Sequence, residues 1–154
     1  MPTLHNAAER EALKVRLRAV RADSVRRWGV MSAGQMMWHL TAAMEMCMGK
    51  LDVSGEKSPL PFPVPKALLR FMIIEMPWPR GAPTLKAVRA ENQAEKQYDL
   101  EAQRARTLAT MDEFAARPLD GLWPLHPLLG QVRGEQYSRL QAKHLNHHLT
   151  QFGV

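Results

Sequence analysis

The sequence predicts an all-α protein, a four-helix bundle whose main helices are joined by long irregular connections. Four segments carry apolar residues at steps of three and four, the spacing that places them on one face of a helix. No segment shows the sustained alternation of apolar and polar residues, or the turn signal, that a β-hairpin needs. Helices with one apolar face bury it against one another, so a bundle is expected. The 154 residues suffice for a single domain over residues 1–154.

The first two helices are predicted from periodicity and from a capping signal. Residues 6–27 carry apolar side chains at helical spacing and form the first predicted helix. Ser32 is followed three positions later by Gln35, the pattern of a capping box, so the second helix is expected to begin at Ala33. Apolar positions then recur up to Gly49, whose tolerance of a positive φ suits the end of a helix.

Proline and glycine separate the remaining helices. Residues 50–65 contain four prolines and predict a long irregular connection. A brief helix is expected over residues 67–76, which prolines flank on both sides, and a third main helix over residues 85–116. Residues 117–133 are again broken by proline and glycine, and the last helix is predicted over residues 134–152.

Composition favours a soluble protein of the cytoplasm. No stretch approaches the roughly 20 apolar residues of a membrane span, and the N-terminus lacks the apolar block of a signal peptide, so no membrane partner is expected. The single cysteine, Cys47, cannot form an internal disulfide and excludes a thiolate-rich zinc site. Because it lies among methionines, it is expected to be a core residue.

A net charge of +6 raises the question of nucleic-acid binding. The basic residues of the N-terminal segment, residues 10–27, are interleaved with acidic ones and have no aromatic residues for base stacking. This pattern favours a solvated helix face over an anion-binding role. A nucleic-acid partner is therefore not expected, and DNA binding stays a third function class, which a steep fall of affinity with salt would support.

The histidines carry the strongest functional signal. His144 and His148 are four residues apart on the last predicted helix and share a face, whereas His147 is rotated away. Burying two imidazoles without partners costs about 1–3 kcal/mol each, and a metal ion would remove this cost. His39 lies about 10 Å along its helix and His144 about 15 Å along its own, so all three can meet. The residues predict a divalent-metal site of His39, His144 and His148 with one open position, suited to zinc, nickel or iron.

The same histidines are also compatible with roles that need no metal. His39 on an apolar stripe can be a hydrogen-bonded core histidine, and His147 and His148 can be cations that interact with the helix C-terminal dipole. His126 either lines the entrance to a site or caps a turn. His147 and Gln151 are candidates to support the metal ligands, since a ligating imidazole usually donates its other N–H to a nearby acceptor.

The histidine pattern resembles that of the DinB-like superfamily of metalloenzymes. Its members carry a histidine on the second helix and a His-x-x-His-His-x-x-Gln string on the last, which here are His39 and residues 144–151. Residues 27–32, 126–130 and 143–153 look more closely like an uncharacterised branch of that superfamily, ending in His-x-x-His-His-x-x-Gln-Phe-Gly. The resemblance implies a four-helix bundle of the DinB-like type with a three-histidine metal site.

The resemblance also implies a function, a metal-dependent enzyme that is a thiol-dependent transferase or a hydrolase. In better-understood relatives the metal activates a low-molecular-weight thiol for reaction with an electrophilic small-molecule substrate, and a bound cation does favour the thiolate. The alternative is a non-catalytic, metal-stabilised bundle that acts as a binding or structural protein, for instance as a homodimer. This chain has Leu149 and Thr150 where many members have an arginine, which puts an anionic-substrate contact there in doubt.

Overall fold

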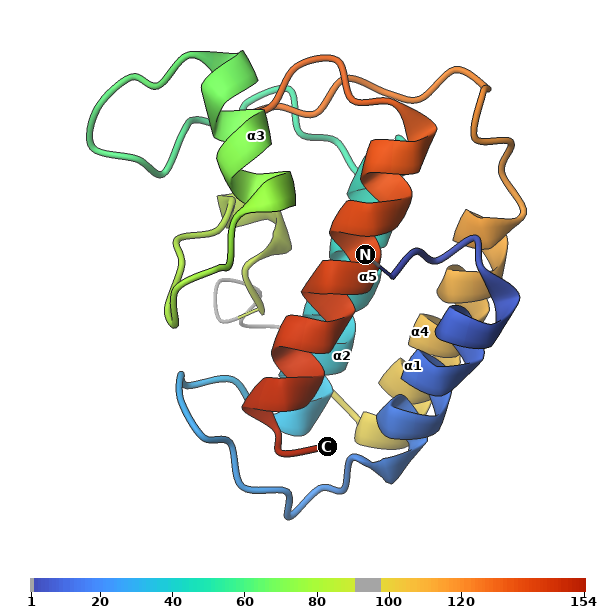
Figure 1. The fold of residues 1–154 in the computed structure, drawn as a ribbon. Helices are drawn as coiled ribbons and strands as arrows, with labels where there is room; N and C mark the ends of the chain where they lie inside the picture. Colours follow the sequence, from blue (N-terminus) through green and yellow to red (C-terminus); the bar gives the residue numbers. More distant parts are fainter. Residues whose placement is uncertain (1, 91–97) are drawn as a thin grey trace.

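The computed structural model describes residues 2–90 and 98–154, and over these residues the chain is helical (Figure 1). The elements in this part of the chain include the α-helices α1 (Ala7–Ala19), α2 (Ala33–Cys47), α3 (Lys66–Glu75), α4 (Leu100–Ala115) and α5 (Gly134–Gln151), and the short 3-10 turn η1 (Lys86–Val88). The described residues form no strand, and one isolated bridge pairs His126 with Gly130. The all-α prediction is confirmed. No helix in this part of the chain is long and apolar enough to cross a membrane.

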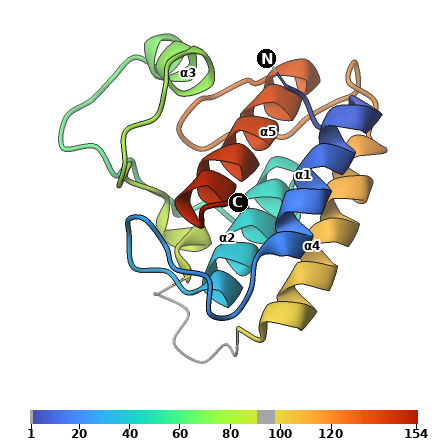
Figure 2. The same ribbon diagram turned by 60° about the horizontal axis from the view of Figure 1, so that its bottom comes forward.

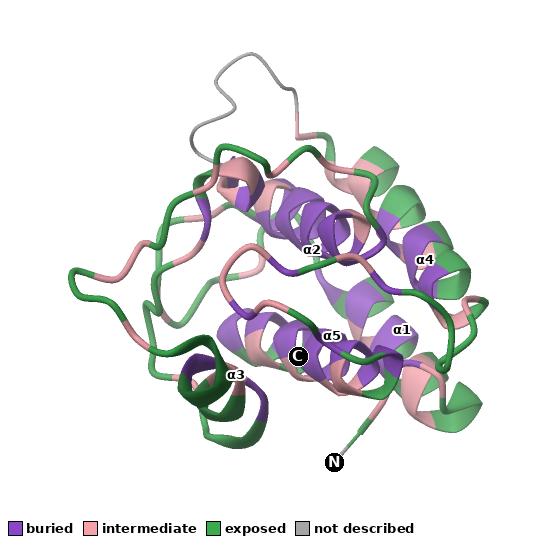
Figure 3. Cartoon of the chain, turned by 90° about the horizontal axis from the view of Figure 1, so that it is seen from above, coloured by how far each residue is buried: buried purple, intermediate pink, exposed green. Residues whose placement is uncertain are grey.

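Four helices pack around one core, and α3 stands outside it (Figures 1 and 2). Helix α1 contacts α4 and α5, and α2 contacts the same two helices, so these four close a ring. Helix α3 contacts α5. Buried residues run along α2 and α5, whereas much of α3 is exposed (Figure 3). The apolar stripes that predict the helices are therefore buried against one another.

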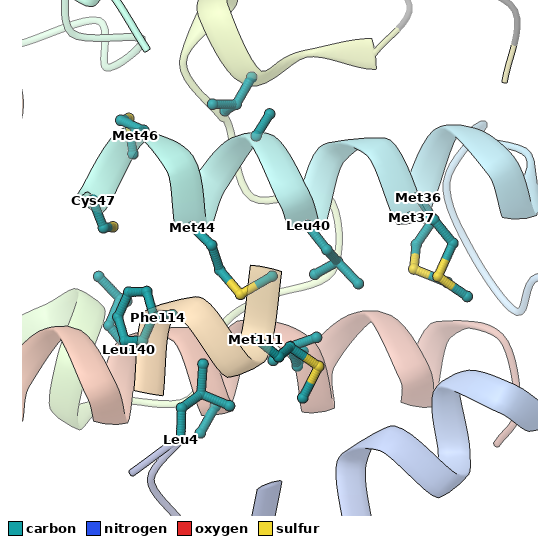
Figure 4. Packing of buried hydrophobic residues seen from close by; sticks show 14 of the residues in the cluster. Leu4, Met36, Met37, Leu40, Met44, Met46, Cys47, Met111, Phe114 and Leu140 are labelled. Atoms are coloured by element: carbon teal, nitrogen blue, oxygen red, sulfur yellow. The ribbon is translucent and has the colours of Figure 1, made fainter. Parts of the chain in front are cut away.

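Helix α2 lies deepest in this core. All but two of its 15 residues are buried. Met36 and Met44 of α2 and Met111 of α4 are fully buried in one apolar cluster (Figure 4). Burying one such side chain contributes about 1.5–3 kcal/mol, so this cluster holds α2 firmly. At the start of α2, Gly34 permits a close approach, because a Cβ there would lie 2.0 Å from the carbonyl oxygen of Tyr98.

The predicted start of α2 is confirmed in detail. The Ser32 hydroxyl accepts from the backbone N–H of Gln35 at 3.1 Å, and Gln35 Oε1 accepts from the backbone N–H of Ser32 at 2.8 Å. These two bonds make the capping box that the sequence predicts. Helix α5 begins at the predicted Gly134, and α3 lies within one residue of its predicted bounds. Residues 50–65 and 117–133 are irregular, as expected.

The first helix is shorter than predicted. It ends at Ala19 rather than near residue 27, because the backbone of Val20 is extended (φ −65°, ψ 131°). The Val20 side chain is nevertheless fully buried, so it continues the apolar pattern without belonging to the helix. Beyond it, the Arg27 N–H donates to the Gln151 carbonyl at 2.7 Å. An N–H inside a helix is already used by the carbonyl four residues earlier, so this bond requires that the helix has ended.

Helix α4 also starts later than the predicted residue 85. Asp99 is its N-cap, and the Asp99 carboxylate accepts from the backbone N–H of Ala102 at 2.7 Å. Residues 86–88 form the separate turn η1, which packs against α2. The part of the predicted helix over residues 91–97 lies outside the described residues. For residues 86–88, the tertiary contact with α2 outweighs the local preference for an α-helix.

Candidate metal centre

Three histidines from two helices meet in the interior of the protein. His39 lies on α2, and His144 and His148 lie on the facing side of α5. Their ring centroids are 4.8 Å (His39 and His144), 4.9 Å (His39 and His148) and 4.8 Å (His144 and His148) apart. One nitrogen from each ring lies within 4.8 Å of the other two, and all three residues are buried. The structure thus brings together all three residues that the sequence predicts as ligands.

The orientation of His39 follows from a backbone carbonyl. Its Nδ1 lies 2.6 Å from the carbonyl oxygen of Val88, at the end of the turn η1. A carbonyl oxygen only accepts, so Nδ1 carries the proton, and Nε2 presents a lone pair toward the other two rings. Besides packing against α2, η1 thus supplies the carbonyl that orients His39.

His148 is oriented in the same way by Gln151. The Gln151 Nε2 donates to the carbonyl oxygen of Trp28 at 2.7 Å, which leaves Gln151 Oε1 to face His148. His148 Nδ1 therefore donates to Oε1, at 2.7 Å, and its Nε2 has a lone pair. The prediction that Gln151 supports a ligand agrees with this hydrogen bond, which is the arrangement that metal-binding histidines use to fix their tautomer.

Gly29 makes room for this support. Its φ of +79° lies in the left-handed region, and a Cβ on it would lie 2.5 Å from Gln151 Nε2. The loop before α2 can therefore approach the Gln151 amide closely only with glycine at this position. Gly29 thereby contributes, through Gln151, to the position of His148.

The spacing of the nitrogen atoms suits a metal ion. His39 Nε2 and His144 Nε2 lie 2.9 Å apart. Two nitrogens bound to one zinc ion at tetrahedral angles lie about 3.3 Å apart, so a shift of a few tenths of an ångström adapts this pair. Among the residues that the structure describes, no other group of His, Cys, Asp or Glu side chains meets the geometry of a metal site.

Burial keeps His144 and His148 neutral. Burial, together with the nearby His39 and His148, lowers the pKa of His144 well below its ordinary value. Burial and the neighbouring His39 lower the pKa of His148 to about 3. Neutral imidazole is the form that binds a metal ion, so protons do not compete for these nitrogens near pH 7.

Two tryptophans border the cluster, and sequence reasoning missed them as neighbours of the site. The ring of Trp78 lies 5.5 Å from that of His144. His147, which is only half-buried, packs between Trp28 and Trp78, with both ring centroids at 5.6 Å. His147 is thus rotated away from the cluster, as its spacing predicts. Nothing in the local sequence around the tryptophans indicates this contact, because they come from two separate connections.

His126 caps a turn. Its Nδ1 accepts from the backbone N–H groups of Leu128 and Leu129 at 3.2 and 3.3 Å. Burial lowers the pKa of His126 to about 4, so the ring is neutral and able to accept. Of the two roles considered for this residue, the structure shows the turn cap.

Cys47 is a core residue, as predicted. It is fully buried, and Gln141 Nε2 donates to its Sγ at 3.1 Å. Burial raises the pKa of the thiol to about 12, so Cys47 stays protonated and is a poor metal ligand or nucleophile.

The comparisons with known proteins give a family and no function. No curated protein and no solved structure matches the chain. The sequence model of a family described as a protein of unknown function (DUF1569) matches residues 3–153. The relation to the DinB-like superfamily stays a prediction. Because the match covers almost the entire length, this chain belongs to the DUF1569 family of proteins of unknown function.

Proposed function

We propose that this chain is a single-domain, metal-dependent enzyme with a DinB-like arrangement of four helices. His39, His144 and His148 bind one divalent ion, and the substrate is a small molecule. The reaction is a thiol-dependent transfer or a hydrolysis. The observation that supports this proposal is the convergence of three buried imidazole nitrogens within 4.8 Å.

The donor set favours zinc, nickel or iron. Imidazole nitrogen suits all three ions, and the described residues contribute three such ligands and no fourth. Structural zinc sites are usually closed by four protein ligands, whereas catalytic sites keep a position for water or substrate. When bound, the ion would lower the pKa of a thiol or of water that ligates it.

The protein itself fixes the tautomer and the orientation of the histidines. Val88 and Gln151 each accept an Nδ1–H, so that His39 and His148 present their Nε2 atoms without rearrangement. All three residues are buried, so their nitrogens lie in the protein interior. No carboxylate of the described residues joins the cluster, so none is placed there to act as a base. This favours a thiol over water as the nucleophile, because a thiol is the stronger acid and needs less help to ionise.

The first test is the metal content of matched variants. Wild-type protein is expected to bind about one ion per chain, and His39→Ala and His148→Ala are expected to lose it, since two imidazoles rarely suffice. His147→Ala is the control, because His147 lies on the same helix and is not part of the cluster. If His39→Ala keeps the ion at wild-type affinity, the proposed ligand set is wrong.

The second test separates catalysis from a structural role. Metal-loaded protein is offered a low-molecular-weight thiol and a panel of electrophiles, and turnover is compared with that of the metal-free protein. A catalytic site leaves a folded protein after chelation, as measured by circular dichroism. Loss of helix on chelation, together with absence of turnover, would instead support a metal-stabilised binding or structural bundle.

A further inference from the structure

Each tryptophan beside the histidine cluster carries a cation on its ring. The guanidinium carbon of Arg80 lies 4.9 Å from the centre of the Trp28 ring, and the Lys143 ammonium lies 5.1 Å from that of Trp78. Such contacts fix a charge relative to the ring. Since both rings pack against His147, and Trp78 also packs against His144, the two positive charges stand at the border of the site.

The two cations differ in what they can still bind. Lys143 donates to three carbonyl oxygens at the end of α3, those of Ile73, Ile74 and Met76, which occupies its donors. Arg80 is exposed, and its guanidinium makes no hydrogen bond or ion pair with any residue that the structure describes. Its five N–H groups are therefore free to bind a ligand.

The backbone holds Arg80 close to the cluster. Trp78 donates its indole N–H to the Ile73 carbonyl at 2.7 Å, which anchors the segment after α3. Pro77 and Pro79 restrict φ on both sides of Trp78. Arg80 is only two residues beyond, about 6–7 Å along an extended chain. Arg80 therefore lies near Trp78, whose ring contacts that of His144.

No acidic side chain pairs with Arg80 in the described part of the chain, whereas the nearby carboxylate of Glu75 partly offsets the charge of Lys143. Glu75, the acidic residue that ends α3, pairs with Arg139 at 2.6 Å. Positive charge without a protein counterion favours a negatively charged ligand. A guanidinium binds a carboxylate through two parallel N–H···O bonds, a match of shape as well as of charge.

We propose that Arg80 binds the carboxylate of a small anionic substrate whose other end reaches the histidine cluster. This inference rests on the proposed function, because it needs a metal ion with a position for the ligand. Arg80 then selects among substrates and does not take part in the reaction at the metal.

The test uses two thiol probes of the same chain length that differ in the terminal group, 6-mercaptohexanoate with a carboxylate and 6-mercaptohexanol with an uncharged hydroxyl. Cobalt-loaded protein is titrated with each, and binding is followed by the ultraviolet absorption of the cobalt thiolate. Wild-type protein is expected to bind the carboxylate probe about tenfold more tightly than the alcohol. Arg80→Gln is expected to abolish this preference and to leave the affinity for the alcohol unchanged.

Arg21→Gln is the matched control. It removes the same charge from an exposed arginine that pairs with Asp23 instead of stacking on either tryptophan. Three results would overturn the inference while the metal site stands. The wild type does not prefer the carboxylate probe, the preference for it survives in Arg80→Gln, or Arg21→Gln reduces that preference equally. Failure of the protein to bind cobalt would remove the proposed function itself, and the two failures are thus distinguishable.

Discussion

Replacing Gln151 by alanine tests whether this side chain fixes the tautomer and orientation of His148 for metal binding. The change removes two hydrogen bonds at once, the buried one that Gln151 accepts from His148 and the partly buried one that it donates to the Trp28 carbonyl. Each bond contributes about 0.5–1.5 kcal/mol, and the partners left buried without a bond add to the loss. We expect the free energy of unfolding of the metal-free protein to fall by about 2–4 kcal/mol. We also expect metal affinity to fall about 10–100-fold, because His148 loses its fixed tautomer.

Two further variants separate these effects. Gln151→Glu keeps an acceptor for His148 and loses the donor to Trp28, so it is expected to recover most of the metal affinity but not the stability. Thr150→Ala, at an exposed position of the same helix, is the control: it removes only the hydrogen bond that the Thr150 hydroxyl accepts from Arg16 at 3.4 Å, so metal affinity should not change. Metal affinity is measured by competition with a chelator, and stability by urea unfolding. The reasoning is refuted if Gln151→Ala loses stability and binds metal as tightly as the wild type.

The loop before α2, the cap of that helix and the turn at His126 can be tested in the same assays. Gly29→Ala places a Cβ 2.5 Å from Gln151 Nε2 at a φ of +79°, so we expect about 1–3 kcal/mol lower stability and weaker metal binding; unchanged metal competition curves would contradict this. Ser32→Ala removes the N-cap of α2 and should cost about 1 kcal/mol in urea unfolding, with metal affinity preserved. His126 has a pKa of about 4 when folded and an ordinary value of 6.5, so only the unfolded chain takes up its proton between these values. The free energy of unfolding should therefore be unaffected by His126 well above pH 6.5 and should fall as the pH decreases, by about 1.4 kcal/mol at pH 5.5. NMR of the folded protein should find the His126 ring neutral at that pH.

The convergence of the three histidines could be predicted because the geometry of a helix fixes where residues three and four positions apart lie in space. The four-residue step from His144 to His148 places both on one face of a helix, and His39 and His144 both lie away from the ends of their predicted helices, so that the three can meet. Gln151 could be predicted as well, since it follows His148 by three residues on the same face. In each case the relation is local, or depends only on counting residues along a helix.

The partners from irregular segments could not be predicted. Val88 supplies only a carbonyl oxygen, which every residue has, and it reaches His39 because η1 folds back on α2. Trp28 and Trp78 meet at His147 although 50 residues separate them in the chain, as the numbering shows. The early end of α1 was missed for a related reason, because Val20 is buried by a bend and not by a helix.

The sequence by itself predicts the all-α class and the start of α2 at its capping box. It also predicts which histidines of α2 and α5 face one another. These features depend on periodicity and on hydrogen bonds between residues three or four positions apart. Three other features are decided only by the tertiary structure: the Val88 carbonyl that orients His39, the end of α1 and the tryptophan side chains beside the cluster. Those contacts join distant segments, and their geometry depends on loops whose path is set by packing and not by local preference.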